Sequence, residues 1–174
     1  MAVETYEGVH ATCADHVESI LREGFWLSQD NLFLGEAVYF YANTDTGLKL
    51  AREIQRYKAQ KKCASEDPGA ILHAKIEAEP ENIFDFTKEP YLSGLERLKN
   101  EFWDECNSKE MPHKEKHKIL NRRRCKMLED FCLATNSNYD LAKIFLPFKS
   151  KTALGLAVFN VDCIKAISKL GDAV

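Results

Sequence analysis

The sequence lacks the features that define several common classes of protein. Its 174 residues include only 8 glycines and 5 prolines, with no stretch rich in either that would form a linker. No apolar run approaches the roughly 18 residues that a membrane-spanning helix requires. The N-terminus has no basic segment followed by an apolar one, so we expect no export signal. The formal net charge of −3 leaves nucleic-acid binding only to a local basic patch.

The 6 cysteines are scattered, and no two form a Cys-x-x-Cys pair. Without an export signal, this pattern indicates a reducing compartment, so we expect free thiols and a cytoplasmic location. His113 and His117 lie four residues apart between Cys106 and Cys125, but the spacing does not match that of a zinc site. We therefore predict no metal site.

What the chain does contain is enough apolar sequence for one packed core, since 45% of its residues are hydrophobic and 29% are charged. Apolar residues at helical spacing predict helices over residues 13–23, 46–62, 91–107 and 112–133. The first helix is expected to begin after Thr12 as its N-cap and to stop at Gly24. Alternating, aromatic and β-branched segments predict a strand that ends near residue 12 and others over 37–41, 71–78, 83–86, 141–148 and 153–158. Residues 164–170 form a last strand or a short helix. The pattern predicts one α+β domain over residues 1–174, with a helical insertion at about 88–138.

Two short motifs flank the first helix. His10, Ala11 and Thr12 end the first strand, and Gly35 precedes a strand that contains Tyr39. This order and spacing resemble the catalytic domains of ADP-ribosyltransferases of the poly-ADP-ribose-polymerase and diphtheria-toxin type. That family writes its first motif as His-Gly-Thr or His-Gly-Ser and its second as Gly-x-Gly-[Ile/Val]-Tyr-Phe. The resemblance implies a split antiparallel β-sheet and NAD⁺ as co-substrate.

The resemblance also implies a role for each matching residue. His10 would hydrogen-bond the adenosine ribose, and the backbone of Ala11 would hold the nicotinamide amide beside the Thr12 hydroxyl. Tyr39 would stack on the nicotinamide ring, in a cofactor site that also includes Gly35. We expect His10 and Tyr39, as the catalytic residues, to line one shared cleft. Because nicotinamide is a good leaving group, positioning and electrostatics would supply most of the rate enhancement.

The chain departs from the family pattern at several positions. Ala11 and Ala37 stand where the family has glycine, and Leu50 stands eleven residues after Tyr39, where many members carry a second tyrosine. The family's glutamate lies three residues before a Val-Tyr-Asp-like segment, and the corresponding position here is Gly155. Members without this glutamate commonly transfer a single unit or are inactive. We therefore expect a mono-ADP-ribosyltransferase, with Glu36 considered as a substitute acid.

A basic run on the last predicted helix includes Arg122, Arg123 and Arg124. Such a run is either a solvated face or a surface that binds an acceptor through phosphates. The resemblance implies that the acceptor is a macromolecule, either protein or nucleic acid (RNA or DNA). By analogy with small stand-alone bacterial members, the protein would be a toxin or defence factor, with an inhibitory partner protein.

Three alternatives stay open. One is a non-catalytic module on the same fold that binds NAD⁺ or ADP-ribose. Another is an RNA 2′-phosphotransferase, which would need arginines beside the His10 motif, where only Arg22 is near. The third is an unrelated α+β interaction protein.

Overall fold

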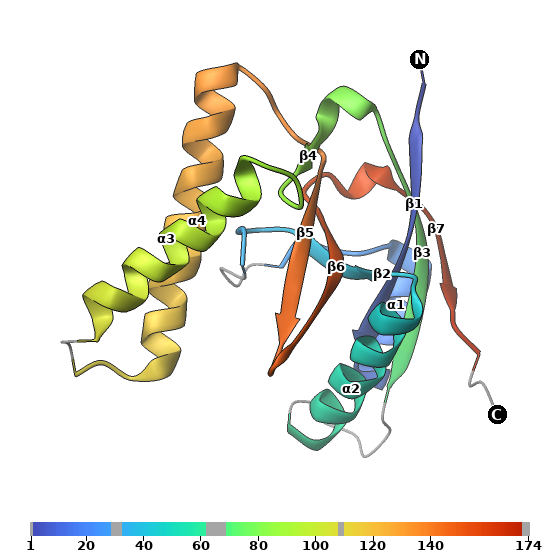
Figure 1. The fold of residues 1–174 in the computed structure, drawn as a ribbon. Coiled ribbons are helices and arrows are strands. Elements are labelled where there is room, and N and C mark those ends of the chain that lie inside the picture. The colour runs from blue at the N-terminus through green and yellow to red at the C-terminus, as the bar shows by residue number, and fades with distance from the viewer. Residues whose placement is uncertain (1, 29–32, 62–68, 108–109, 172–174) are drawn as a thin grey trace.

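A computed structural model describes residues 2–28, 33–61, 69–107 and 110–171 of the chain (Figure 1). Within these residues the strands are β1 (Glu4–Thr12), β2 (Val38–Ala42), β3 (Ala70–Ala78), β4 (Ile83–Asp85), β5 (Leu141–Phe148), β6 (Lys151–Val158) and β7 (Ile164–Lys169). The helices are α1 (Ala14–Glu23), α2 (Asp45–Lys61), α3 (Tyr91–Cys106) and α4 (His113–Thr135), with short 3₁₀ turns at Pro80–Asn82 and Val161–Cys163. The predicted α+β class is confirmed, and α3 and α4 lie within residues 88–138, where a helical insertion is predicted. The predicted end of the second helix at residue 62 lies outside the described residues.

The strands form one mixed sheet in the order β4-β5-β6-β2-β1-β3-β7. Only β4 and β5 are parallel, and every other neighbouring pair is antiparallel. The sheet is narrow in its middle, because the pairing of β1 with β2 is limited to Gly8 with Ala42 and Val9 with Tyr41, extended by one backbone hydrogen bond from Asn43 to Glu7. By contrast, β1 pairs with β3 along the whole of Glu4–Thr12. The strands that carry the two sequence motifs therefore meet at the junction of the sheet that has the fewest paired residues.

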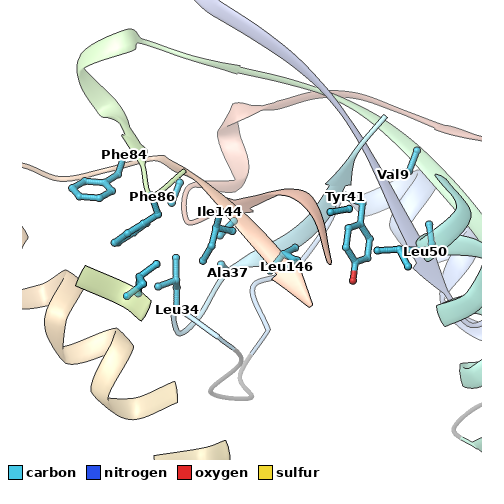
Figure 2. Close-up of a cluster of buried hydrophobic side chains, with 14 of the residues drawn as sticks. Val9, Leu34, Ala37, Tyr41, Leu50, Phe84, Phe86, Ile144 and Leu146 are labelled. Atoms are coloured by element: carbon cyan, nitrogen blue, oxygen red, sulfur yellow. The ribbon is translucent and has the colours of Figure 1, made fainter. Parts of the chain in front are cut away.

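Side chains alternate between the two faces of a strand, and the two faces of this sheet bury separate clusters. The first core cluster lies against α2, α3 and α4, and Figure 2 labels its members Val9, Leu34, Ala37, Tyr41, Leu50, Phe84, Phe86, Ile144 and Leu146. The second core cluster lies against α1 and includes Val17, Phe25, Val38, Phe40, Leu72, Ile76, Leu156 and Val158. A third, small cluster of Phe102, Cys106 and Leu120 joins α3 to α4. The α3–α4 pair therefore has a core of its own and also contacts the sheet.

Two local predictions are wrong. Thr12 does not cap α1, because β1 continues through it in register with Ala70, and the N-cap residue is Cys13. The expectation of free thiols holds for Cys106, Cys125, Cys132 and Cys163 but not for Cys13, which is disulfide-bonded. The ambiguous segment 164–170 is a strand, β7. Among the described helices, none has the length and apolar character needed to cross a membrane.

Candidate ligand-binding cavity

A cavity of about 810 Å³ opens beside the narrow junction of the sheet. Its walls come from β1, β2, β5 and β6 on the sheet and from α2, α3 and α4. In the view of Figure 1, the α3–α4 pair lies to the left of β5 and β6, and α2 lies to their right. Small-molecule and cofactor sites occupy roughly 300–1,000 Å³, so the cavity has the size of a ligand site.

Aromatic rings from separate elements line this cavity. They include Phe33 before β2, Tyr39 and Tyr41 on β2, Tyr57 on α2 and Trp103 on α3. Figure 2 shows the Tyr41 ring extending from β2 away from the strands. Flat aromatic surfaces suit a ligand that contains planar rings.

The charged residues that line the cavity are mostly basic. Among the described lining residues they are Lys58 of α2, Lys99 of α3 and Arg124 of α4, against the single acid Glu96 of α3. This excess of positive charge favours an anionic ligand.

Tyr39 is fixed through its hydroxyl. The hydroxyl accepts a hydrogen bond from the backbone N–H of Leu34 and donates one to the carbonyl oxygen of Gly35, both at 2.9 Å. Burial is the main cause that raises the pKa of Tyr39 well above its usual range, so the phenol stays protonated. Gly35 has a φ of +106°, which glycine adopts without strain. The Tyr39 hydroxyl therefore fixes the backbone of residues 34–35 at the edge of the cavity.

His10 makes its closest polar contact with the backbone of Tyr39. Its Nδ1 lies 2.8 Å from the Tyr39 carbonyl oxygen, and Nδ1 is the donor because a carbonyl can only accept. The imidazole packs edge-on against Phe25 and Phe40, with ring centroids 5.2 and 5.8 Å away. Both phenylalanines belong to the second core cluster, whereas Tyr39 packs against the first. Both residues contribute to the cavity lining, but the two rings leave the sheet on opposite faces.

The environment of His10 keeps it neutral. Burial, with a smaller contribution from the Lys58 ammonium, lowers the pKa of His10 from 6.5 to about 4. At neutral pH the ring is therefore an uncharged imidazole that carries its proton on Nδ1.

The other two residues of the first motif are buried at the end of β1. Ala11 lines the cavity, and its carbonyl oxygen accepts a hydrogen bond of 2.6 Å from Lys58 Nζ. Thr12 is also buried but is not among the lining residues. In this structure the backbone carbonyl expected to hold an amide is therefore already bonded to a lysine.

The position of the family's glutamate is filled by packing. Gly155 lies on β6 opposite Tyr41 and Ile144 of its two neighbouring strands. A Cβ at this position would approach Leu146 Cδ1 to 2.3 Å, so no larger side chain fits without a shift. Glu36 is exposed and lies in a shallow depression with Trp26 instead of in the cavity.

Several lining residues were not predicted from sequence. Leu50, which stands in the place of the second stacking tyrosine, is buried in the first core cluster. Tyr57 and Lys58, further along α2, reach the cavity instead. Glu96 and Lys99 of α3 were also missed, and the available signal was polar residues on the helix face that carries Leu92, Leu95 and Trp103.

The three consecutive arginines of α4 do not form one surface. Arg122 is exposed, and Arg123 pairs with Glu105 of α3 at 2.7 Å. Arg124 is only 8% exposed, and its guanidinium lies 4.0 Å from the centre of the Phe33 ring. The expected acceptor-binding surface is therefore divided, and its third arginine faces the cavity.

The histidines of α4 are engaged with an aromatic ring. His113 and His117 lie 4.4 Å apart between ring centroids, and both contact Trp103. In the part of the chain that the structure describes, no three His, Cys, Asp or Glu side chains are grouped to hold a metal ion. Arg22, beside the first motif, is exposed and paired with Glu23, so no observation favours RNA-phosphate binding there.

Comparisons of the chain with protein-family models, curated proteins and solved structures found no match. Function is therefore inferred from the cavity itself and from the two motifs that meet beside it.

Proposed function

We propose that the cavity binds NAD⁺ and that the protein is a mono-ADP-ribosyltransferase acting on a protein or nucleic-acid acceptor. The observation that carries this proposal is the place of the cavity. It opens where the strands of the two motifs meet, and both Ala11 and Tyr39 line it. These are residues that the resemblance assigns to the nicotinamide end of NAD⁺.

The sheet topology supports the finer assignment of the fold. Strands β4-β5-β6-β2 and β1-β3-β7 are joined by two residue pairs between β1 and β2, by a backbone hydrogen bond from the Asn43 N–H to the Glu7 carbonyl, and by the contact of His10 with the Tyr39 carbonyl. A sheet that is nearly divided at this point is consistent with the split sheet of the ADP-ribosyltransferases. The dinucleotide would lie along the division, on the face that carries α2, α3 and α4.

The lining chemistry suits a dinucleotide. NAD⁺ has two planar bases and a negatively charged pyrophosphate, and the cavity offers aromatic rings and an excess of basic groups. Tyr39 and Tyr41 extend from the strand that would lie beside the nicotinamide. Stacking of a flat cationic ring on tyrosine contributes orientation as well as affinity.

The chemical step would depend on positioning and on one carboxylate. Cleavage of the nicotinamide–ribose bond develops positive charge on the ribose, and a nearby carboxylate stabilises that charge. Glu96 is the one acid among the described lining residues, so we assign it the role that the glutamate at the position of Gly155 has in the resembled family. His10 acts as a positioning residue, because its contact is with the Tyr39 carbonyl and its ring faces the second core cluster.

The test uses NAD⁺ labelled in its adenylate half, with separate pools of protein and RNA as acceptors. Wild-type protein should release nicotinamide and label one pool. Glu96→Gln should lose most of the release while still binding NAD⁺. Glu101→Gln is the matched control, since Glu101 is an exposed glutamate of the same helix that lies outside the cavity lining. Equal release by wild type and Glu96→Gln would refute the role of Glu96, and no release by wild type would refute the transferase.

A second candidate is a non-catalytic module that binds NAD⁺ or ADP-ribose. The packing at Gly155 and the bond from Lys58 to the Ala11 carbonyl favour it, because both remove a feature that catalysis uses in the resembled family. This candidate predicts saturable binding of both ligands in a calorimetric titration, with no nicotinamide released during prolonged incubation.

A further inference from the structure

Arg124 is a buried cation for which the described residues provide no acidic partner. Its Nη1 donates a hydrogen bond of 3.0 Å to Asn121 Oδ1, and its Nε has no hydrogen-bond partner in the part of the chain that the structure describes. Phe33 covers one face of the guanidinium. Among the ion pairs formed by the described residues, none involves Arg124. A cation–π contact and one bond to a neutral amide offset only part of the cost of burying a full charge.

The basic neighbours of Arg124 on α4 do form ion pairs. Arg123 is paired with Glu105, and Lys126 is paired with Asp130 at 2.7 Å. Both of these basic side chains are partly exposed, 40% for Arg123 and 64% for Lys126, so water also solvates them. Arg124, in contrast, lines the cavity and has a donor, Nε, that none of the described residues uses.

We propose that Arg124 and Asn121 form a subsite for a phosphoryl group of a small molecule bound in the cavity. The guanidinium fork matches the oxygens of phosphate, and a buried donor that is left unpaired is satisfied when such an oxygen arrives. Lys99, which also lines the cavity, adds positive charge that a doubly charged phosphoryl group uses better than a single carboxylate does. The helical insertion is then a wall of the ligand site.

The identity of the phosphoryl group rests on the proposed function, under which it is the pyrophosphate of NAD⁺. The subsite itself rests only on the burial, the unpaired Nε and the position of Arg124. The experiment therefore uses phosphorylated and unphosphorylated probes, so that the subsite and the reaction are tested separately.

Calorimetric titration of the full chain would compare inorganic pyrophosphate, ADP-ribose, nicotinamide riboside and, as a carboxylate probe, succinate. Arg124→Met keeps a flexible apolar side chain against Phe33 and removes the charge. It should weaken pyrophosphate and ADP-ribose by about 10- to 100-fold, the loss expected for a charge-assisted hydrogen bond. Affinity for nicotinamide riboside, which carries no phosphate, should be unchanged. Arg122→Met, which removes an exposed charge two positions away, should leave all the affinities within about twofold of wild type.

Thermal unfolding of the same variants separates binding from folding. Removal of an unpaired buried charge should leave the melting temperature of Arg124→Met equal to or above that of wild type. Arg124→Lys keeps the charge without the fork and should recover part of the pyrophosphate affinity. If Arg124→Met is unfolded, the comparison of Arg124→Lys with wild type decides the question, because a purely structural arginine predicts equal pyrophosphate affinity in the folded pair.

Equal affinity of wild type and Arg124→Met for pyrophosphate and ADP-ribose would overturn the subsite, as would binding of succinate in preference to pyrophosphate. Pyrophosphate binding that depends on Arg124, without nicotinamide release from NAD⁺, would support the subsite and refute the transferase. If wild type and Arg124→Met released nicotinamide at the same rate, at NAD⁺ concentrations below saturation, the result would support the transferase and refute the subsite.

Discussion

Replacing Gly155 by alanine tests how tightly the sheet is packed at the position where the resembled enzymes carry their glutamate. A Cβ at Gly155 would lie 2.3 Å from Cδ1 and 2.4 Å from Cγ of Leu146, and 3.1 Å from the carbonyl oxygen of Phe40. Real Cβ atoms essentially never make contacts below 3.0 Å, so Leu146 has to move. Leu146 is itself buried in the first core cluster and has little room to do so.

The expected cost follows from this overlap. Added methyl groups in a packed core typically cost about 1–3 kcal/mol, and the overlap with two side-chain atoms places Gly155→Ala toward the upper end. For a chain of this size, each 1 kcal/mol lowers the melting temperature by about 2–4 °C. Gly155→Glu should cost more, because it adds the desolvation of a carboxylate to the same overlap. Introducing the glutamate of the resembled family at this position is therefore predicted to destabilise the fold.

A double-mutant cycle with Leu146→Ala isolates the contact. Leu146→Ala removes the atoms that Gly155→Ala would strike and by itself should cost about 2–5 kcal/mol. The double variant should cost less than the sum of the two single variants by about 1–2 kcal/mol, within the range observed for residues in contact. The measurement is the free energy of unfolding in urea, with the slope of each transition compared to wild type.

Gly94 provides the matched control. It lies within α3, and a Cβ there would meet no atom within 4 Å. Gly94→Ala should therefore stabilise the protein by about 0.5–1 kcal/mol through the higher helix propensity of alanine. If Gly155→Ala behaved like Gly94→Ala, or if the cycle gave no coupling energy, the account of why this position excludes a carboxylate would be wrong.

Three further predictions concern the first two motifs. Tyr39→Phe should lower the free energy of unfolding in urea by about 1–3 kcal/mol, because it leaves a backbone N–H and a backbone carbonyl of residues 34–35 without their partner; an unchanged value would show that the loop does not depend on the hydroxyl. Because the pKa of His10 is about 4 in the folded protein and 6.5 ordinarily, the unfolded chain binds more protons between these values. Stability should therefore fall by up to about 3 kcal/mol as the pH is lowered through this window, and urea titrations of His10→Gln should show a smaller loss. Lys58→Met frees the Ala11 carbonyl, so calorimetry should show tighter binding of nicotinamide relative to wild type, whereas equal affinity would mean that the lysine does not compete with the amide.

The order of helices and strands could be predicted because it depends on local periodicity. The apolar spacing within residues 91–107 and 112–133 is enough to define α3 and α4 to within a few residues. Alternation along 71–78 likewise defines β3 and its two faces. The N-cap of α1 could not be predicted in this way, because Thr12 belongs to β1 and pairs with Ala70, a residue distant in sequence.

The faces of the sheet on which the His10 and Tyr39 side chains lie depend on the register between β1 and β2. This register cannot be predicted from the sequence of either strand alone. Once Val9 is paired with Tyr41, His10 falls opposite Phe40, and alternation places its ring with the second core cluster. A shift of one residue in that pairing would have put both rings on one face. The spacing of the motifs predicts that the two strands lie side by side, but it does not predict on which face of the sheet each ring lies.

The division of the arginine triplet, by contrast, follows from helix geometry. Consecutive residues of an α-helix are about 100° apart around its axis, so Arg122, Arg123 and Arg124 cannot share one face. One of the three had to turn inward if α4 packed against the sheet, and Leu120 and Leu128, four residues on either side of Arg124, mark the buried face. The basic run was therefore better evidence for a cation in the cavity than for a basic surface.

The α3–α4 pair supplies most of the charged side chains that line the cavity. The sheet contributes mainly aromatic and apolar side chains, whereas Glu96, Lys99 and Arg124 all come from α3 and α4. Since these helices share a core of their own around Phe102, the charged wall can be positioned without changing the strands that carry the two motifs. A ligand that contacts both Tyr39 and Arg124 would join the insertion to the sheet across the cavity. Binding should therefore protect the amides of α4 from hydrogen exchange as well as those of β2, and this joint protection distinguishes a ligand that spans the cavity from one held by the strands alone.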